Sequence, residues 1–323
     1  MIITKTPLRM SFFGGGSDIP EFYNQSPGIV ISTAIDRHIQ IAVNKCQTDH
    51  CRVIYSELEV SPTASTIKHD RVRETLKHFN INSNIEICSF SDISTKGTGL
   101  GSSSTFTVGL LNALYNLKYL PYNKRDLAEL ACEIEIERCG EPIGKQDQYA
   151  AAYGGFNVIR FDSSGVEVTP INAPFEILQD LNENLMCYST GMTRNTGDIL
   201  SKQVDNLKKN VNITYTKKLV DIAEQSLKYL RAQKIDDFGA LLHETWDMKK
   251  KLAPGITNNH IDSMYLTAKQ AGALGGKLLG AGGGGYMLFY VPKDRRDTVT
   301  RAMKEFKQFH FKFTDEGSSW TRL

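Results

Sequence analysis

Glycine gathers in three short clusters, and this distribution limits the fold more than any other feature of the chain. The clusters are Gly14 to Gly16, the alternating set Gly97, Gly99 and Gly101, and a run from Gly272 to Gly285. Glycine inside regular structure costs about 0.5–1 kcal/mol relative to alanine, so such clusters are kept where the backbone needs a positive φ or must approach a ligand closely. We therefore expect three tight turns whose bare backbone faces a ligand.

Hydrophobic patterning places the second cluster between a strand and a helix. Residues 84–93 alternate apolar and polar side chains, as a half-buried strand does, and residues 105–120 carry apolar side chains at helical spacing. The other predicted elements are a strand over 28–46, a helix from Lys124 to about Arg138, two strands over 153–169, long helices over roughly 197–252 and a strand over 286–291. This mixture predicts an α+β fold, divided into domains 1–165 and 166–323.

The charge balance and the N-terminus argue against several classes of protein. The chain of 323 residues has 38 Lys and Arg against 36 Asp and Glu, and this formal charge of +2 argues against nucleic-acid binding. We see no signal peptide and no apolar run of membrane-spanning length, so we expect no membrane association. Six scattered cysteines in such a chain are typical of reduced thiols. These features predict a cytoplasmic protein and leave its oligomeric state undecided.

The segment KGTGLGSSSTFTVG at 96–109 carries the clearest chemical signal. A glycine-rich turn that opens a helix directs backbone N–H groups and the positive end of the helix dipole at an anion. It lacks the GK[ST] of a Walker A loop, and the structural alternative is a flexible loop with an ordinary serine cap. The residues that we predict at the phosphates of a nucleotide are Gly97, Gly99, Leu100, Gly101, Ser102, Ser103 and Ser104.

Three segments occur in the order and approximate spacing of the motifs of the galactokinase, homoserine kinase, mevalonate kinase and phosphomevalonate kinase (GHMP) superfamily. They are PLRMSFFGGGSDIPEFY at 7–23, GTGLGSSS at 97–104 and KLLGAGGGGYMLF at 277–289. The chain resembles this superfamily over nearly its whole length. The resemblance implies a two-domain small-molecule kinase that uses ATP and Mg²⁺ and carries its phosphate loop in the N-terminal part.

Within the superfamily, the chain looks most like the D-glycero-D-manno-heptose 7-phosphate kinases. The similarity lies in the first motif, in GEPIGKQDQYAAAYGGFN at 140–157 and in GGKLLGAGGGG at 275–285. It implies phosphorylation of the anomeric hydroxyl of a small sugar phosphate to the 1,7-bisphosphate, on the route to GDP-heptose for surface polysaccharide. A kinase for another sugar, such as fucose or galactose, is one alternative. A catalytically silent sugar or nucleotide sensor on the same fold is another.

The resemblance also implies two catalytic residues. Asp147 matches the aspartate that lies beside the acceptor hydroxyl as a general base or orienting group. Arg9 matches a basic residue near that aspartate and the γ-phosphate, where it would stabilise the transferring charge. Without the resemblance, Asp147 is interpreted as a turn or capping residue and Arg9 as a surface charge, because most charged side chains are solvated.

Mg²⁺ prefers a few hard oxygen ligands and fills its other positions with water and phosphate. The superfamily implies a serine of the second motif, here Ser103 with Ser102 and Ser104 as close alternatives, and a glutamate upstream of Asp147. The spacing favours Glu135, with Glu133 and Glu137 as alternatives.

The acceptor contacts are assigned to the outer glycine motifs. The residues assigned to the sugar are Gly15, Gly16, Ser17, Asp18, Gly282 and Gly283. Asp18 has a second interpretation, as the N-cap of a helix that begins near Pro20. A phosphate at the far end of the sugar would need cations, for which Arg194 is our candidate. The run from Lys249 to Lys251 is more typical of a solvated helix end and is left unassigned.

Overall fold

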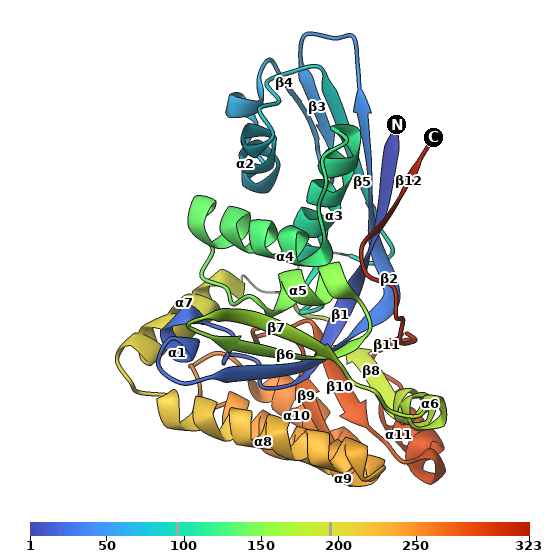
Figure 1. Ribbon diagram of the computed structural model, residues 1–323. Helices are drawn as coiled ribbons and strands as arrows, with labels where there is room; N and C mark the ends of the chain where they lie inside the picture. Colours follow the sequence, from blue (N-terminus) through green and yellow to red (C-terminus); the bar gives the residue numbers. More distant parts are fainter. Residues whose placement is uncertain (95–96, 194–195) are drawn as a thin grey trace.

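The computed structural model describes residues 1–94, 97–193 and 196–323, and it combines two sheets with helices packed against them (Figure 1). In this described part the larger sheet has eight strands, ordered β12-β1-β2-β5-β3-β4, with β6 paired to β2 and β7 to β6. Its strands are β1 (Ile2–Phe13), β2 (Gly28–Lys45), β3 (Cys51–Ile54), β4 (Leu58–Ser61), β5 (Ile85–Ser91), β6 (Phe156–Asp162), β7 (Gly165–Pro170) and β12 (Ser319–Arg322).

Two helices of the first half, α3 and α5, pack against this sheet, and α2 and α4 pack against other helices (Figure 1). The central one, α3, packs against β1 and β2 and buries Leu110, Leu111 and Leu114 in the core. This packing anchors the helix that follows the second glycine cluster. The helical elements are α1 (Pro20–Tyr23), a 3₁₀ turn (Ala64–Thr66), α2 (Asp70–His78), α3 (Ser102–Leu117), α4 (Lys124–Cys132), a π-helix (Glu133–Arg138) and α5 (Gln146–Tyr153).

A smaller antiparallel sheet, ordered β11-β8-β10-β9, lies in the second half. The helix α9 packs so closely on it that a Cβ on Gly239 would lie 2.2 Å from the Tyr290 ring. The elements are α6 (Phe175–Glu183), β8 (Leu185–Ser189), α7 (Thr196–Lys208), α8 (Ile213–Arg231), α9 (Ile235–Lys249), α10 (Asn259–Gln270), β9 (Gly275–Leu278), β10 (Tyr286–Tyr290), a 3₁₀ turn (Lys293–Arg295), α11 (Arg296–Ala302) and β11 (Gln308–Phe309).

The α+β fold and the elements predicted around the second glycine cluster are confirmed. The predicted strands correspond to β2, β5, the hairpin β6–β7 and β10, and the long helical region contains α7, α8 and α9. The division near residue 165 stays a prediction. The last strand, β12, returns from the end of the chain to pair with β1.

The helix predicted from Lys124 to Arg138 changes its geometry at Cys132. It is α-helical to that residue and continues as a π-helix to Arg138. Such wide turns alter which side chains share a face and often occur at functional sites. The change places Glu135 inside the π-helix, where its side chain is buried.

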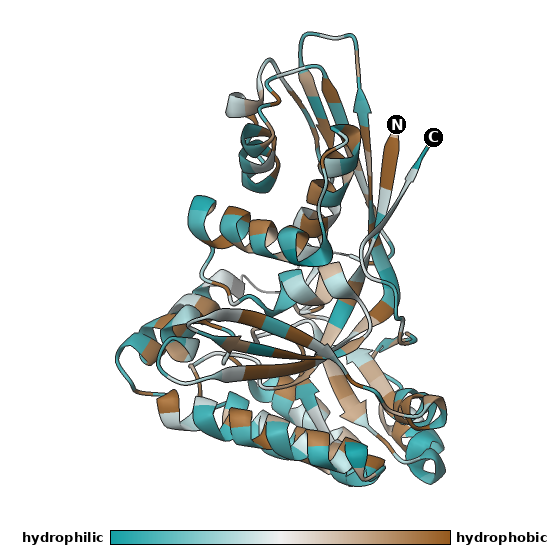
Figure 2. Ribbon diagram, viewed as in Figure 1, coloured by the Kyte–Doolittle hydropathy of each residue, from teal (hydrophilic) through white to brown (hydrophobic). Residues whose placement is uncertain are grey.

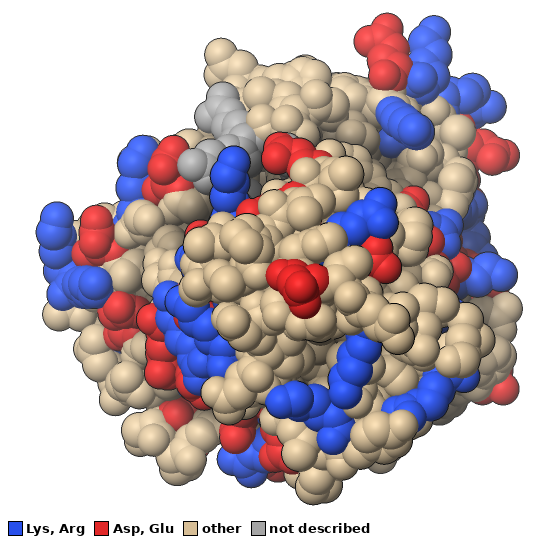
Figure 3. Space-filling model, turned by 90° about the horizontal axis from the view of Figure 1, so that it is seen from above, with Lys and Arg blue, Asp and Glu red and all other residues tan. Residues whose placement is uncertain are grey.

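Apolar side chains line the interior, and charges of both signs mix on the surface. Figure 2 shows hydrophobic residues along the strands of both sheets and on parts of the helices that cover them. On the face seen in Figure 3, Lys and Arg are interspersed with Asp and Glu. Among the helices of the described ranges, none is long and apolar enough to cross a membrane.

Candidate active site

Residues of all three glycine motifs line one large pocket. Its volume is about 960 Å³. Residues of the first motif, such as Arg9 and Gly16, face it together with Gly99 and Ser103 of the second and Gly280 of the third. Segments from both ends of the chain thus meet at one cavity.

The second glycine motif ends at the N-terminus of α3. The N-cap is Gly101, whose φ of +75° lies in the left-handed region that favours glycine, and it makes no side-chain cap hydrogen bond. The interpretation of this turn as an ordinary serine cap is therefore wrong. Ser102, Ser103 and Ser104 form the first helical turn and line the pocket, where a helix N-terminus suits an anion.

Close glycine contacts join this turn to the other two motifs. A Cβ on Gly101 would lie 3.2 Å from Arg9 Cγ and 3.3 Å from Asp147 Oδ2, so the turn rests on these two side chains. A Cβ on Gly99 would lie 2.4 Å from the carbonyl oxygen of Leu279. The third motif therefore supports the second through a backbone contact that leaves no room for a Cβ.

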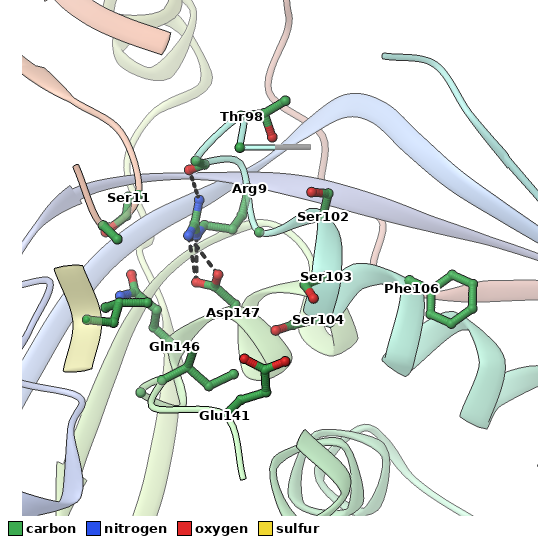
Figure 4. A pocket seen from close by; sticks show the side chains of 18 of the residues that line it. Arg9, Ser11, Thr98, Ser102, Ser103, Ser104, Phe106, Glu141, Gln146 and Asp147 are labelled. Carbon is green, nitrogen blue, oxygen red and sulfur yellow. Dashed lines mark hydrogen bonds and ion pairs between the residues drawn. The ribbon is translucent and has the colours of Figure 1, made fainter. Parts of the chain in front are cut away.

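Arg9 and Asp147 form a bidentate ion pair beside the loop (Figure 4). Arg9 Nε donates to Asp147 Oδ1 and Nη2 donates to Oδ2, both at 2.8 Å. Arg9 Nη1 also donates to the carbonyl oxygen of Gly99 at 2.6 Å. The side chain of Arg9 is 4% exposed and that of Asp147 23%, so the arginine is no surface charge and the carboxylate remains open to the pocket.

Asp18 lines the pocket but does not cap α1. The N-cap of that helix is Ile19, without a side-chain hydrogen bond, so the capping interpretation of Asp18 is wrong. Its Oδ1 accepts from the Gly16 amide at 2.9 Å and its Oδ2 from the Gln146 amide at 3.2 Å. Burial raises the pKa of Asp18, and the charge of Asp147 raises it further, while the Gly16 amide lowers it. Asp18 thus ties the first motif to the neighbour of Asp147.

Ser17 is structural and does not reach the pocket wall. Its fully buried hydroxyl donates to the carbonyl oxygen of Gly14 at 2.7 Å and accepts from the Ile29 amide at 3.0 Å. Its assignment to the sugar is corrected, because these bonds use the hydroxyl to close the glycine turn.

The sugar contacts assigned to Gly282 and Gly283 are corrected in the same way. The amide of Gly283 donates to the carbonyl oxygen of Ile256 at 2.9 Å, and a Cβ on Gly282 would lie 2.8 Å from Ile256 Cα. Neither glycine lines the pocket, and the third motif presents Gly280 and Ala281 there.

Glu135 has its carboxylate occupied by other side chains. It accepts from Arg71 Nε at 2.8 Å, Thr107 Oγ1 at 3.1 Å and Gln148 Nε2 at 2.6 Å. The side chain is 0% exposed and does not line the pocket. The arrangement therefore does not present Glu135 to a metal as we expected. The alternative glutamates do not line the pocket either. Glu133 pairs with Arg138, and Glu137 is exposed.

Glu141 is the glutamate of this region that faces the pocket (Figure 4). Arg71 Nη2 donates to Glu141 Oε1 at 2.9 Å, so one guanidinium joins it to the buried Glu135. In the described residues no group of three or more His, Cys, Asp or Glu could hold a metal. Hard oxygens from Ser103 and Glu141 nevertheless fit Mg²⁺, which takes one or two protein oxygens and completes its shell with phosphate.

Two buried lysines in the pocket escaped our sequence assignment. Arg194 lies outside the described residues. Lys249 and Lys277 line the cavity at 8% and 3% exposure. Lys250 and Lys251 instead extend over aromatic rings, those of Trp246 and Tyr215. Helical spacing was the available signal for Lys249, which lies one turn after the apolar core of α9, and membership of the third motif was the signal for Lys277.

Three other polar residues of the wall were also missed. Ser11 Oγ, Gln146 Oε1 and Thr245 Oγ1 are buried and have no hydrogen-bond partner among the described residues. Buried polar atoms are normally paired, so these three fit a site completed by a hydroxyl-rich ligand. Ser11 lies two residues after Arg9 on the same strand, and Gln146 precedes Asp147.

The phosphate loop, the arginine-held aspartate and the polar cavity together define a phosphotransferase for a small hydroxylated acceptor. Matches to known protein families agree with this assignment. The chain belongs to the GHMP kinases, since the GHMP kinases N terminal domain matches residues 65–155 and the GHMP kinases C terminal domain matches residues 226–308. It is therefore an ATP-dependent phosphotransferase that acts on a sugar hydroxyl.

Relatives with assigned activities lie within the same family. D-glycero-alpha-D-manno-heptose 7-phosphate kinase of Campylobacter jejuni is 30% identical over 99% of this chain and 98% of that protein. Mevalonate kinase of Pyrococcus horikoshii is 25% identical over 92% of this chain and 82% of that protein. The crystal structure of a D-glycero-D-manno-heptose 1-phosphate kinase from Bacteriodes thetaiotaomicron has a TM-score of 0.83 at 24% identity, covering 100% of this chain and 99% of that one. The predicted family and fold are confirmed.

Proposed function

We propose that this kinase transfers the γ-phosphoryl group of ATP to the anomeric hydroxyl of D-glycero-D-manno-heptose 7-phosphate. The products are the 1,7-bisphosphate and ADP, and the bisphosphate leads to GDP-heptose for surface polysaccharide. The observation that carries the proposal is the 30% identity with the Campylobacter jejuni heptose 7-phosphate kinase over 99% of the chain. The use of ATP and the six free thiols support a cytoplasmic location.

In the proposed reaction, Asp147 orients the acceptor hydroxyl and takes its proton. The hydroxyl oxygen forms a bond to the γ-phosphorus, the bond from that phosphorus to the bridging oxygen of ADP breaks, and ADP leaves. Arg9 holds both carboxylate oxygens of Asp147, so it fixes their direction and adds positive charge beside the transferring group. The N-terminal turn of α3 binds the phosphate chain of the nucleotide.

We assign the adenine ring of ATP to a cluster of aromatic side chains at the pocket wall. The His69 and Phe106 rings are stacked with centroids 5.0 Å apart, and Tyr55 meets His69 edge-on at 4.9 Å. All three residues line the pocket. Burial lowers the pKa of His69 below its usual 6.5, so the imidazole is neutral at pH 7 and suits contact with an uncharged purine.

For Mg²⁺, we assign Ser103 and Glu141 as the protein ligands. When bound, the metal would neutralise negative charge on the phosphate oxygens. Glu135 then acts through other groups, because it fixes both Arg71 and Thr107. Arg71 in turn holds Glu141 at the pocket wall.

A coupled assay of ADP release with ATP and a panel of sugars tests the proposal. The panel contains D-glycero-D-manno-heptose 7-phosphate, the unphosphorylated heptose, fucose and galactose. We expect the heptose 7-phosphate to give the highest kcat/KM, and phosphorus NMR to show a new phosphate on the anomeric carbon. Preference for fucose or galactose would contradict the substrate, and turnover of none of the panel would favour a sensor.

A further inference from the structure

Lys249 and Lys277 are the pocket cations without a carboxylate partner. Among the described residues that line the pocket, the only other Lys or Arg side chains are Arg9 and Arg71. Arg9 is paired with Asp147, and Arg71 is paired with two glutamates. The positive charge of the two arginines is therefore balanced within the protein, whereas that of the two lysines is not.

Backbone carbonyls orient both ammonium groups. Lys249 Nζ donates to the carbonyl oxygen of Leu278 at 2.9 Å and to that of Gly280, and Lys277 Nζ donates to the carbonyl oxygen of Ser11. An ammonium group has three N–H donors. Among the described residues, these bonds use two of the donors of Lys249 and one of those of Lys277, so each ammonium group keeps at least one donor. The carbonyls thus position the two groups and leave donors for a ligand.

Burial of two cations that repel each other is unfavourable. Burial lowers the pKa of Lys249 to about 7, and Arg9 contributes to the same shift. The pKa of Lys277 falls well below its usual value through burial and through repulsion by Lys249 and Arg9. An unpaired buried charge is tolerated when a ligand of opposite charge completes the site. The two lysines therefore have the properties of an anion-binding site. Binding of an anion there would favour the protonated, charged form of both side chains.

Each lysine has a neighbour whose buried hydroxyl lacks a hydrogen-bond partner among the described residues. Thr245 precedes Lys249 by one turn of α9, and Ser11 supplies the carbonyl that holds Lys277. The buried hydroxyl oxygens of Thr245 and Ser11 are the unpaired atoms that fit a hydroxyl-rich ligand. A cation pair beside such groups matches a molecule that carries both hydroxyls and an anionic group.

We propose that Lys249 and Lys277 bind the phosphate group of a phosphorylated acceptor sugar and make that group a requirement for efficient turnover. The inference rests on the proposed function, because the acceptor in that function carries both hydroxyls and a phosphate. Each lysine donates a charge-assisted hydrogen bond to a phosphate oxygen. The substrate thereby supplies the negative charge that the pocket lacks.

The test combines two substitutions with two substrates. Lys249→Met and Lys277→Met keep much of the side-chain length and remove the charge. Each variant is assayed with D-glycero-D-manno-heptose 7-phosphate and with the unphosphorylated heptose. We expect wild type to prefer the phosphorylated sugar in kcat/KM, and each variant to reduce that preference by about tenfold or more, as the loss of a charged hydrogen bond predicts. The KM for ATP should change by less than about threefold.

Lys251→Met is the matched control, because this lysine lies two residues after the end of α9, with its Nζ over the Tyr215 ring, 5.6 Å from the centroid. The Lys251→Met variant should prefer heptose 7-phosphate over the unphosphorylated heptose in kcat/KM to the same degree as wild type. A purely structural role for the buried lysines would slow both substrates equally and leave the preference intact, which overturns the inference. A raised KM for ATP with an intact preference also overturns it, since the lysines would then serve the nucleotide.

Calorimetry on the wild-type enzyme covers the case in which a variant does not fold. Heptose 7-phosphate is titrated at pH 8 in two buffers with different ionisation enthalpies. Binding should draw protons from the buffer, because a bound phosphate favours the charged form of both lysines. Binding without proton uptake contradicts the inference. If wild type shows no preference for the phosphorylated heptose, the proposed function itself fails, and that result is visible before any substitution is made.

Discussion

Arg9 contacts both carboxylate oxygens of Asp147 at 2.8 Å, although 138 positions separate the two residues in the chain. The fork of a guanidinium matches the plane of a carboxylate, so the pair fixes the direction in which Asp147 faces the pocket. Gly101 packs against both side chains, and Arg9 also holds the carbonyl of Gly99. The glycine-rich turn and the proposed acceptor-activating carboxylate are therefore positioned by the same arginine.

Asp147→Asn should abolish most of the catalysis and spare nucleotide binding. The amide keeps the shape of the side chain but cannot accept the proton of the acceptor hydroxyl. We expect kcat to fall by about 10²- to 10⁴-fold, the range for loss of a general base. The dissociation constant of ATP, measured by calorimetry, should stay within about threefold of wild type. Near-normal turnover would remove Asp147 from the mechanism.

Gly101→Ala should damage the site through contact as well as through backbone strain. Gly101 has φ +75°, and a Cβ there would lie 3.2 Å from Arg9 Cγ. Gly255→Ala is the matched control, because Gly255 has φ +89° and, apart from its chain neighbours, no described residue comes within 4 Å of the added Cβ. Both variants should lose about 1–2 kcal/mol of stability from the left-handed conformation.

Only Gly101→Ala should lower kcat/KM for ATP, by about tenfold or more, because small displacements of reacting groups are costly. Thermal melts and steady-state kinetics on both variants give the comparison. Equal activity in the two would show that the contact with Arg9 and Asp147 has no catalytic consequence.

Glu141→Gln should raise the Mg²⁺ concentration needed for half-maximal activity, because an uncharged amide is a weaker ligand for a hard cation. Glu135→Gln should act mainly on stability. Its carboxylate accepts from Arg71, Thr107 and Gln148, and disruption of such a buried network costs about 1–3 kcal/mol. Magnesium titrations and urea unfolding separate the two effects. The reverse outcome would return the metal to Glu135, the ligand expected from the sequence.

The KM for the sugar phosphate should rise with pH above 7. The pKa of Lys249 is lowered to about 7, so the free enzyme loses this charge as the pH passes that value. The groups that face it are Arg9 and Lys277, both cations, and Arg9 is neutralised by Asp147. An anion that binds the charged form then binds less tightly by up to about tenfold per pH unit.

The measurement covers pH 7 to 9, where a phosphate monoester with a second pKa near 6 is already a dianion. Lys249→Met should show a flatter profile than wild type. A wild-type KM for the sugar phosphate that is constant from pH 7 to 9 would argue against titration of this lysine.

Local sequence was informative wherever a single segment makes the feature. The glycines before Ser102 and the apolar spacing after it predicted a turn that opens a helix, and α3 begins at Ser102. Asp18 shows the limit of such reasoning. Its place before Pro20 suggested a helix cap, but the bond it makes to the Gln146 amide comes from a segment 128 residues away. Propensity near a helix start gives no information about such a partner.

The sequence by itself determined the family, the α+β class, the glycine-rich turn that opens a helix and the candidates Arg9 and Asp147, because motifs and periodicity depend on neighbouring residues. Only the tertiary structure decided which glutamate faces the pocket and which lysines are buried there. Burial and pairing depend on what other segments bring to the same place. Lys249 and Lys250 are adjacent in sequence, yet one lines the cavity and the other lies over Trp246.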